Sequence, residues 1–150
     1  MGTCNQFLVG MNGSINFLCY PDFDLPTILA ALLDDKKGGR FEIRPQLANV
    51  CVCQLYLPDT NILLTRFLLY EGVAELTDYM SIEKYEAQPN DIVRRVSVIR
   101  RNVQLKLICQ PRFDHAAAKH TLKMPDRCAK FFPVDSPSSP MSLYSGLSVT

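Results

Sequence analysis

Two short segments of this chain each combine a proline, one aromatic ring and nearby charged side chains. The first begins at Pro21 and the second at Pro111. Such a set can hold a sugar through stacking and hydrogen bonds, but it can also form a strand-exit corner with a core phenylalanine and an aspartate bonded to nearby backbone N–H groups. The sequence leaves both interpretations open. The candidate rim or interface residues are Asp22, Phe23, Asp24, Pro26, Arg112, Phe113 and Asp114.

The other acidic residues do not select a catalytic pair. Glycoside hydrolysis ordinarily uses two carboxylates that flank the glycosidic bond. The chain has 15 Asp and Glu residues, and the sequence alone does not select which two would form such a pair. Glu42, Glu71, Glu75, Glu83 and Glu86 all have simple surface or turn interpretations, because acidic side chains are rarely buried unless paired. The chain also lacks a G-x-S-x-G elbow, a phosphate-binding glycine loop and a dinucleotide fingerprint. We expect no catalytic residue and no cofactor.

The histidines and cysteines do not have the spacing of a metal site. His115 and His120 lie five residues apart in a polar stretch, and we expect surface or hydrogen-bonding roles for them. Cys51 and Cys53 would share one face of a strand, but a metal or redox role would need more ligands nearby. We predict reduced thiols in the core and no bound metal. The six cysteines are Cys4, Cys19, Cys51, Cys53, Cys109 and Cys128.

Composition excludes several classes of protein. The chain has 16 Lys and Arg against 15 Asp and Glu, so it lacks the basic excess typical of a nucleic-acid binder. Its longest apolar run, near Ile62 to Tyr70, is interrupted by Thr65 and Arg66 and is too short to cross a bilayer. The first twenty residues lack the basic region of a secretory signal. We expect a cytoplasmic protein without membrane or nucleic-acid partners.

Short apolar or alternating runs separated by turn residues predict an all-β, antiparallel β-sandwich. One short helix is predicted from Thr27 to Leu33, because Asp24 and Pro26 resemble start signals and Gly38-Gly39 follows. The predicted strands are 4–10, 15–20, 40–44, 50–57, 62–70, 73–79, 92–100 and 103–109, with weaker candidates at 119–124, 129–132 and 142–150.

Two hairpins and a pair of arginine doublets complete the pattern. Asn12-Gly13 predicts a tight primed turn between the first two strands, and Glu71-Gly72 predicts a second hairpin. Arg94-Arg95 and Arg100-Arg101 resemble basic clusters, but strand alternation sends the members of each doublet to opposite faces. We interpret these arginines as a solvated surface.

Five stretches of the chain resemble one family in order and spacing. Gly13 to Pro26 is similar to the "DGSIDWLCLPRFDSP" stretch of the trehalase-like N-terminal domain of glycoside hydrolase family 15. The other four similar stretches are Leu32 to Phe41 ("LLD…GG.W.I.P"), Tyr56 to Leu63 ("YLPGTNVLET"), Leu76 to Met80 ("VTDFMP") and Pro111 to Thr121 ("PRFDYGRAKHT"). Asn16-Phe17 and Asp22 depart from the family's usual Asp-Trp and Arg, and the chain has no Trp.

The resemblance implies a β-supersandwich placed before an (α/α)6 barrel that carries two catalytic glutamates. Residues 1–150 would then be an N-terminal domain without the barrel, incomplete at its C-terminus because the last run reads as strand. The expected function is a non-catalytic domain of a glucoamylase-like or trehalase-like enzyme, packing against the barrel and lending a loop to an α-glucoside cleft. The alternatives are a free-standing carbohydrate-binding module and a truncated product without independent function. Open sheet edges would favour self-association of the fragment.

Overall fold

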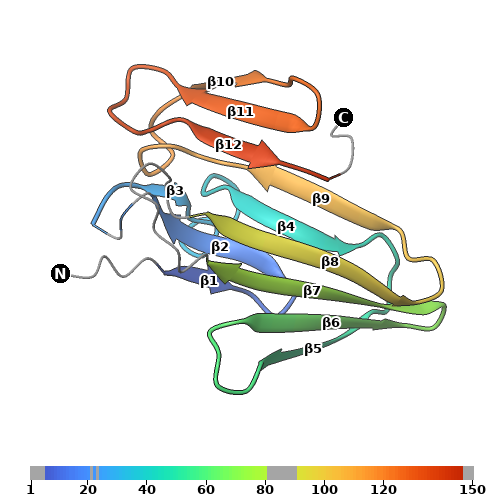
Figure 1. Cartoon of the computed structure of the whole chain (residues 1–150). Helices are drawn as coiled ribbons and strands as arrows, with labels where there is room; N and C mark the ends of the chain where they lie inside the picture. Colours follow the sequence, from blue (N-terminus) through green and yellow to red (C-terminus); the bar gives the residue numbers. More distant parts are fainter. Residues whose placement is uncertain (1–5, 21, 23, 81–90, 147–150) are drawn as a thin grey trace. The chain divides into compact units, whose positions relative to one another are not determined.

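The computed structural model describes residues 6–20, 22, 24–80 and 91–146, and these residues form strands and turns without a helix (Figure 1). None of the described segments is a helix that could span a membrane. The predicted all-β class is therefore confirmed. The strands are β1 (Phe7–Val9), β2 (Ser14–Cys19), β3 (Thr27–Leu29), β4 (Arg40–Pro45), β5 (Cys51–Tyr56), β6 (Leu63–Leu69), β7 (Gly72–Met80), β8 (Ile92–Arg100), β9 (Leu105–Gln110), β10 (His120–Lys123), β11 (Cys128–Pro133) and β12 (Met141–Tyr144).

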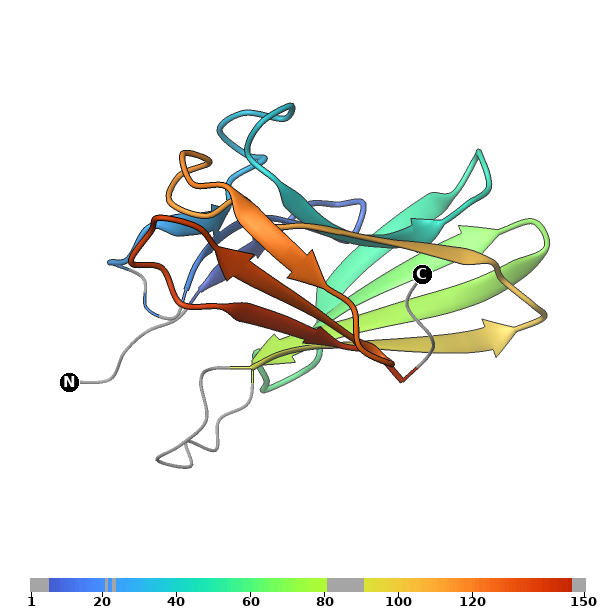
Figure 2. The same ribbon diagram turned by 90° about the horizontal axis from the view of Figure 1, so that it is seen from above.

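The strands form three sheets. The first has the order β1-β2-β4-β9, with β3 paired to β2. The second is a four-stranded antiparallel meander in the order β5-β6-β7-β8. The third has the order β10-β11-β12 and is also antiparallel, as the orange to red arrows of Figure 2 show.

The chain divides into two compact units. The first unit comprises residues 1–8, 16–41 and 109–150 and includes β3 and the sheet β10-β11-β12. The second unit comprises residues 9–15 and 42–108 and includes the meander β5 to β8. Each unit has its own buried apolar residues, with Phe113 and Phe131 in the first and Phe67 and Leu76 in the second.

The second unit has two packed layers of strands. A Cβ atom placed on Gly13 would lie 3.1 Å from the Phe67 ring, 3.3 Å from the Leu76 side chain and 3.5 Å from the Ile43 carbonyl oxygen. The turn before β2 thus lies close against Phe67 and Leu76 on the inner face of the meander, with no room for a side chain at Gly13. Phe67 and Leu76 are 2% and 1% exposed, so this contact is the core of a β-sandwich.

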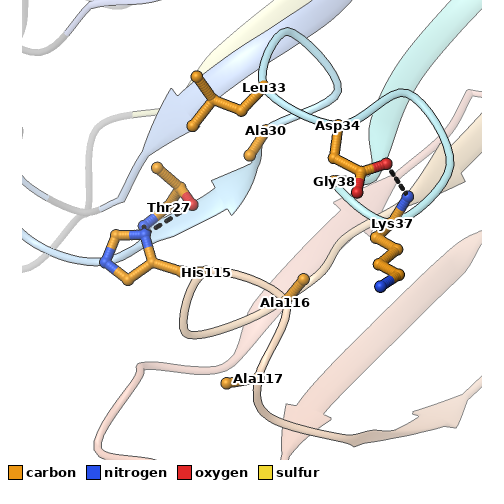
Figure 3. Close-up of a pocket in the computed structure, with 9 residues that line it drawn as sticks. All are labelled: Thr27, Ala30, Leu33, Asp34, Lys37, Gly38, His115, Ala116 and Ala117. Carbon is orange, nitrogen blue, oxygen red and sulfur yellow. Dashed lines mark hydrogen bonds between the residues drawn. The ribbon is translucent and has the colours of Figure 1, made fainter.

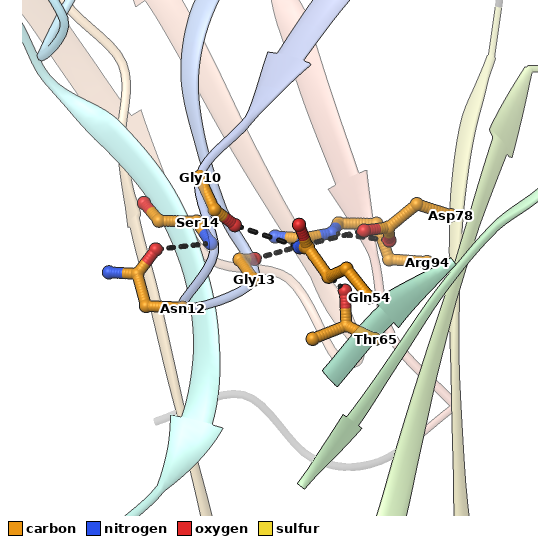
Figure 4. Close-up of polar contacts among 8 residues, drawn as sticks. All are labelled: Gly10, Asn12, Gly13, Ser14, Gln54, Thr65, Asp78 and Arg94. Atoms are coloured by element: carbon orange, nitrogen blue, oxygen red, sulfur yellow. Dashed lines mark hydrogen bonds and ion pairs between the residues drawn. The ribbon is translucent and has the colours of Figure 1, made fainter. Parts of the chain in front are cut away.

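A buried ion pair crosses this core (Figure 4). Asp78 on β7 accepts hydrogen bonds from Arg94 on β8 at 2.8 and 3.1 Å, and the two side chains are 0% and 2% exposed. The Arg94 guanidinium also donates to the Gly13 carbonyl oxygen, which connects β8 to the hairpin turn. The prediction of a solvated surface was therefore wrong for Arg94, although Arg95 is exposed.

The hairpin between β1 and β2 is confirmed, but its predicted primed turn is wrong. Gly13 N donates to the Gly10 carbonyl at 2.9 Å, and Gly10 N donates to the Ser14 carbonyl at 2.8 Å. Gly13 has a φ of 77°, whereas Asn12 is not among the residues with positive φ. This is a three-residue loop with glycine in the left-handed position. The predicted hairpin at Glu71-Gly72 is confirmed by the pairing of Leu69 with Gly72.

The predicted helix from Thr27 to Leu33 is wrong. Thr27–Leu29 forms β3, which pairs antiparallel with β2 through Leu18 and Leu29. The chain then turns, since Leu33 N and Asp34 N both donate to the Ala30 carbonyl. The cause is tertiary pairing, which outweighs weak local helix signals in a segment that begins with β-branched residues. Asp24, which lies in a turn, therefore has no helix to cap.

Two further burial predictions were wrong. Glu42 was expected at the surface, but it is 5% exposed and forms an ion pair with Arg44 at 3.1 Å. Cys51 and Cys53 were expected in the core, but both are exposed on β5. Cys19 and Cys128 are buried as predicted, and neither forms a disulfide. Glu83, Glu86 and Cys4 lie outside the described residues.

Candidate functional site

The structure brings the chain after Pro26 beside the chain after Pro111. Arg112 N donates to the Ile28 carbonyl oxygen at 2.8 Å, and His115 N donates to the Thr27 carbonyl oxygen at 3.3 Å. The side chains join as well, because Thr27 Oγ1 lies 3.1 Å from His115 Nδ1. Both segments belong to the first unit. The continuations of the two similar motifs therefore form one local cluster, 88 residues apart in the chain.

The predicted site residues differ in exposure, and of them only the segment Arg112 to Asp114 is shown in this cluster. Phe113 is fully buried, as a core phenylalanine at a strand-exit corner would be. Asp22, Pro26 and Asp114 are half-buried, Asp24 and Arg112 are exposed, and Phe23 lies outside the described residues. A sugar could therefore reach the charged groups of the cluster but could not stack on Phe113.

The turn that follows Phe113 has an unusual backbone. Asp114, His115 and Ala116 have φ values of 52°, 53° and 69°, so three successive residues that are not glycine adopt the left-handed region. Ala117 N donates to the Asp114 carbonyl at 2.9 Å, which closes the turn. Left-handed residues of this kind cost about 1–2 kcal/mol each and concentrate at functional sites. We call residues 114–116 the left-handed turn.

A shallow pocket of about 270 Å³ lies against the left-handed turn (Figure 3). Its small side chains come from Ala30, Ala116 and Ala117, while its polar groups come from four residues on three segments. Gly38 must be glycine here, because a Cβ atom would lie 2.1 Å from the Ala30 carbonyl oxygen. The lining residues are Thr27, Ala30, Leu33, Asp34, Lys37, Gly38, His115, Ala116 and Ala117.

Asp34 supplies the one carboxylate of the pocket lining. Its Oδ1 accepts hydrogen bonds from Lys36 N at 2.9 Å and Lys37 N at 3.0 Å, and these bonds hold the pKa of the carboxyl below its usual value. A carboxylate kept ionised in this way is a poor general acid. Glycoside hydrolysis ordinarily uses two carboxylates across the bond, so the pocket residues can bind a polar ligand but lack that catalytic pair.

The described residues also contain no group of three or more His, Cys, Asp or Glu side chains that could hold a metal ion. Sequence reasoning missed Thr27, Lys37 and Ala116 as members of the site. It had considered His115 only for a surface or hydrogen-bonding role, which the structure confirms through the contact with Thr27. The one available signal was the nearness of these residues to the two similar motifs.

His120 lies next to the buried ring of Phe113. Its ring meets Phe113 and Phe131 edge to face, with centroid distances of 5.7 and 5.6 Å. Burial against these rings, together with the positive charge of Arg112, lowers the pKa of His120 from its ordinary value of 6.5. The folded chain therefore disfavours the protonated imidazole.

We expect this shift to make the chain less stable in mild acid. Below pH 6.5 the unfolded state binds more protons at His120 than the folded state does. The free energy of unfolding should fall as the pH drops through 6.5 and should stop falling below the lowered pKa of the folded state. Urea unfolding between pH 7 and pH 5 checks this, and His120→Gln should flatten the curve. An unchanged slope in His120→Gln would contradict the assignment.

Comparison with known proteins identifies the family of this chain. Residues 3–148 match the family described as "Trehalase-like, N-terminal". The chain belongs to this family. In this trehalase-like N-terminal domain, Gly13 and Asp78 belong to two of the similar stretches, and both accept hydrogen bonds from Arg94 inside the sandwich.

The curated relatives are much longer proteins. Trehalase of Thermoplasma acidophilum is 33% identical over 115 residues, which cover 75% of this chain and 20% of the relative. Trehalase 1 of Sulfolobus acidocaldarius is 34% identical over 120 residues, covering 80% of this chain and 20% of the relative. Trehalase of Mycobacterium tuberculosis is 27% identical over 124 residues, which cover 72% of this chain and 18% of the relative. The chain spans about a fifth of the length of these relatives, and no solved structure gives a significant match.

Proposed function

We propose that this chain is the non-catalytic N-terminal domain of a trehalase-like enzyme of glycoside hydrolase family 15. The observation that carries the proposal is the family match over residues 3–148, combined with trehalase relatives of which the matched segment covers only 20%. The domain packs against a catalytic (α/α)6 barrel, which supplies both catalytic glutamates. The substrate is an α-glucoside, with trehalose the first choice because the relatives carry that name.

The domain lends the left-handed turn to the substrate cleft of that enzyme. Three strained residues in a row are costly, and loops held on rigid strands are where binding groups are usually placed. His115 is held by Thr27 at 3.1 Å, so its position is fixed before any ligand arrives. Asp34 and Lys37 add opposite charges at the pocket wall, which suits a neutral ligand rich in hydroxyl groups.

Two further features support a cytoplasmic location and self-association of the isolated domain. Cys51 and Cys53 are free and exposed, which favours the reducing conditions of a cytoplasmic enzyme. Val96 and Val98 on β8 are 39% and 47% exposed, although their register partners Leu76 and Ala74 are buried. This exposed apolar strip favours self-association when the domain is isolated from the rest of its enzyme.

The test is a chimera in which residues 3–148 replace the matching segment of Thermoplasma acidophilum trehalase. We expect the chain alone to leave trehalose intact, and the chimera to hydrolyse it. His115→Ala in the chimera should lower kcat/KM by about tenfold or more, because it removes one positioning contact. Ala116→Gly should raise stability by about 1 kcal/mol, because it relieves a positive φ.

Arg66→Ala, on the exposed face of the meander, is the matched control and should leave kcat/KM unchanged. If His115→Ala lowers stability but leaves kcat/KM unchanged, the cluster has only a structural role. Tight binding of glucans or trehalose by the chain alone would instead favour a free-standing carbohydrate-binding module.

A further inference from the structure

Two exposed thiols lie together in the second unit, on a strand separate from the pocket. Cys51 and Cys53 belong to β5, an edge strand of the meander, and both are exposed. They alternate with Val52, so both side chains are on one face of the strand. Their register partners on β6 are Leu68 and Arg66, whereas Phe67 between them is buried. The thiols are therefore on the outer face of the sheet.

Strand geometry prevents these thiols from joining directly. The Cα atoms of residues i and i+2 in a strand are about 6.6 Å apart, and their Cβ atoms point the same way at a similar separation. A disulfide needs Cβ atoms about 3.5–4.5 Å apart. The six register pairs between β5 and β6 hold the strand extended. Two thiolates on opposite sides of one metal ion are about 4.6 Å apart when each metal–sulfur bond is about 2.3 Å. Both χ1 rotamers, about 180° and about −60°, are common in strands, so different rotamers at Cys51 and Cys53 can bring the two sulfur atoms closer together than the Cβ atoms.

The surroundings favour an ion that accepts two ligands. Leu55 and Leu68 flank the thiols and are apolar, with 47% and 38% of their surface exposed. Glu75 belongs to the same face, but its carboxylate is bound to Arg66 at 2.6 Å. No group of three or more metal-binding side chains occurs in the described ranges. Zinc takes four ligands in structural sites, and the two thiolates supply only half of that number.

We propose that Cys51 and Cys53 form a two-thiolate surface site for a soft monovalent cation of the Cu(I) type. Thiolates select such ions over the hard cations Mg²⁺ and Ca²⁺. Binding converts two thiols and Cu⁺ into a bis-thiolate complex with one negative charge, and it releases two protons to solvent. No electron is transferred, because the copper enters as Cu(I).

The test is a competition for Cu(I) between the 150-residue chain and a coloured chelator, carried out under anaerobic conditions. The chelator loses its colour when it gives up the metal, so the loss of absorbance measures the Cu(I) taken by the chain. We expect the chain to withdraw one Cu(I), with affinity rising with pH because protons leave on binding. Cys51→Ser and Cys53→Ser should each weaken binding by more than about 100-fold, since each removes a direct ligand. Cys109→Ser and Cys4→Ser are the matched controls and should bind like the parent chain.

Circular dichroism of each variant checks that the fold is kept; Cys51→Ser and Cys53→Ser should keep it, because exposed Cys→Ser changes remove little packing. Failure of the parent chain to compete for Cu(I) would overturn the proposal. Equal binding by the parent and by both β5 variants would also overturn it, as would a loss in Cys109→Ser or Cys4→Ser as large as that in Cys53→Ser.

Discussion

Replacing Asp78 by Ala should lower the free energy of unfolding by about 3–5 kcal/mol, because it leaves a buried guanidinium without its carboxylate. The Arg94 side chain is 2% exposed and donates to Asp78 at 2.8 and 3.1 Å, so water cannot replace the missing partner without opening the sandwich. The loss should appear in urea unfolding as a lower midpoint with a similar slope.

The same strand provides a matched control. Glu75 on β7 forms an ion pair with Arg66 at 2.6 Å, but the Arg66 side chain is 48% exposed. Glu75→Ala should therefore cost only about 0–1 kcal/mol. The double change Asp78→Leu with Arg94→Met should recover much of the stability lost in Asp78→Ala, because it removes both buried charges together. Equal losses in Asp78→Ala and Glu75→Ala would show that burial does not distinguish the two pairs.

Replacing Phe113 by Ala should cost about 3–5 kcal/mol, as expected for removing a large side chain from a packed core. Phe113 is 0% exposed and its ring meets His120 at a centroid distance of 5.7 Å. The neighbouring change Arg112→Ala removes an exposed side chain and should stay within about 0.5 kcal/mol of the parent. Thermal and urea unfolding measure both variants. A loss below about 1 kcal/mol in Phe113→Ala would contradict its place in the core.

Strand positions were predictable because alternation and turn residues act locally. The prediction for 92–100 coincides with β8, and the weak candidate 119–124 contains β10. The helix prediction failed at Thr27 to Leu33 because Asp24, Pro26 and the glycine pair are turn signals as much as helix signals. Pairing of Leu18 with Leu29 decides between them, and local helix signals do not include such a pairing between strands.

The candidate site was predictable only in part for a similar reason. The two proline-containing motifs can be recognised in the sequence, but the contact between Thr27 and His115 joins residues 88 positions apart. Arg94 was misplaced because alternation assigns Arg94 and Arg95 to opposite faces without saying which face is the core. The partner that decides this, Asp78, lies across a register of β7 with β8 that the sequence does not reveal.

The strand order has a consequence for how this chain acquires its fold. The meander pairs β5, β6, β7 and β8 in chain order, so each new strand closes only a short loop. The neighbouring strands β4 and β9, by contrast, are separated by residues 46–104, so their pairing closes a much longer loop. Loop-closure entropy makes such distant pairings slow. We expect the meander to form first and the pairing of β9 with β4 to limit the folding rate, which leaves the partly folded chain dependent on the stability of the meander alone.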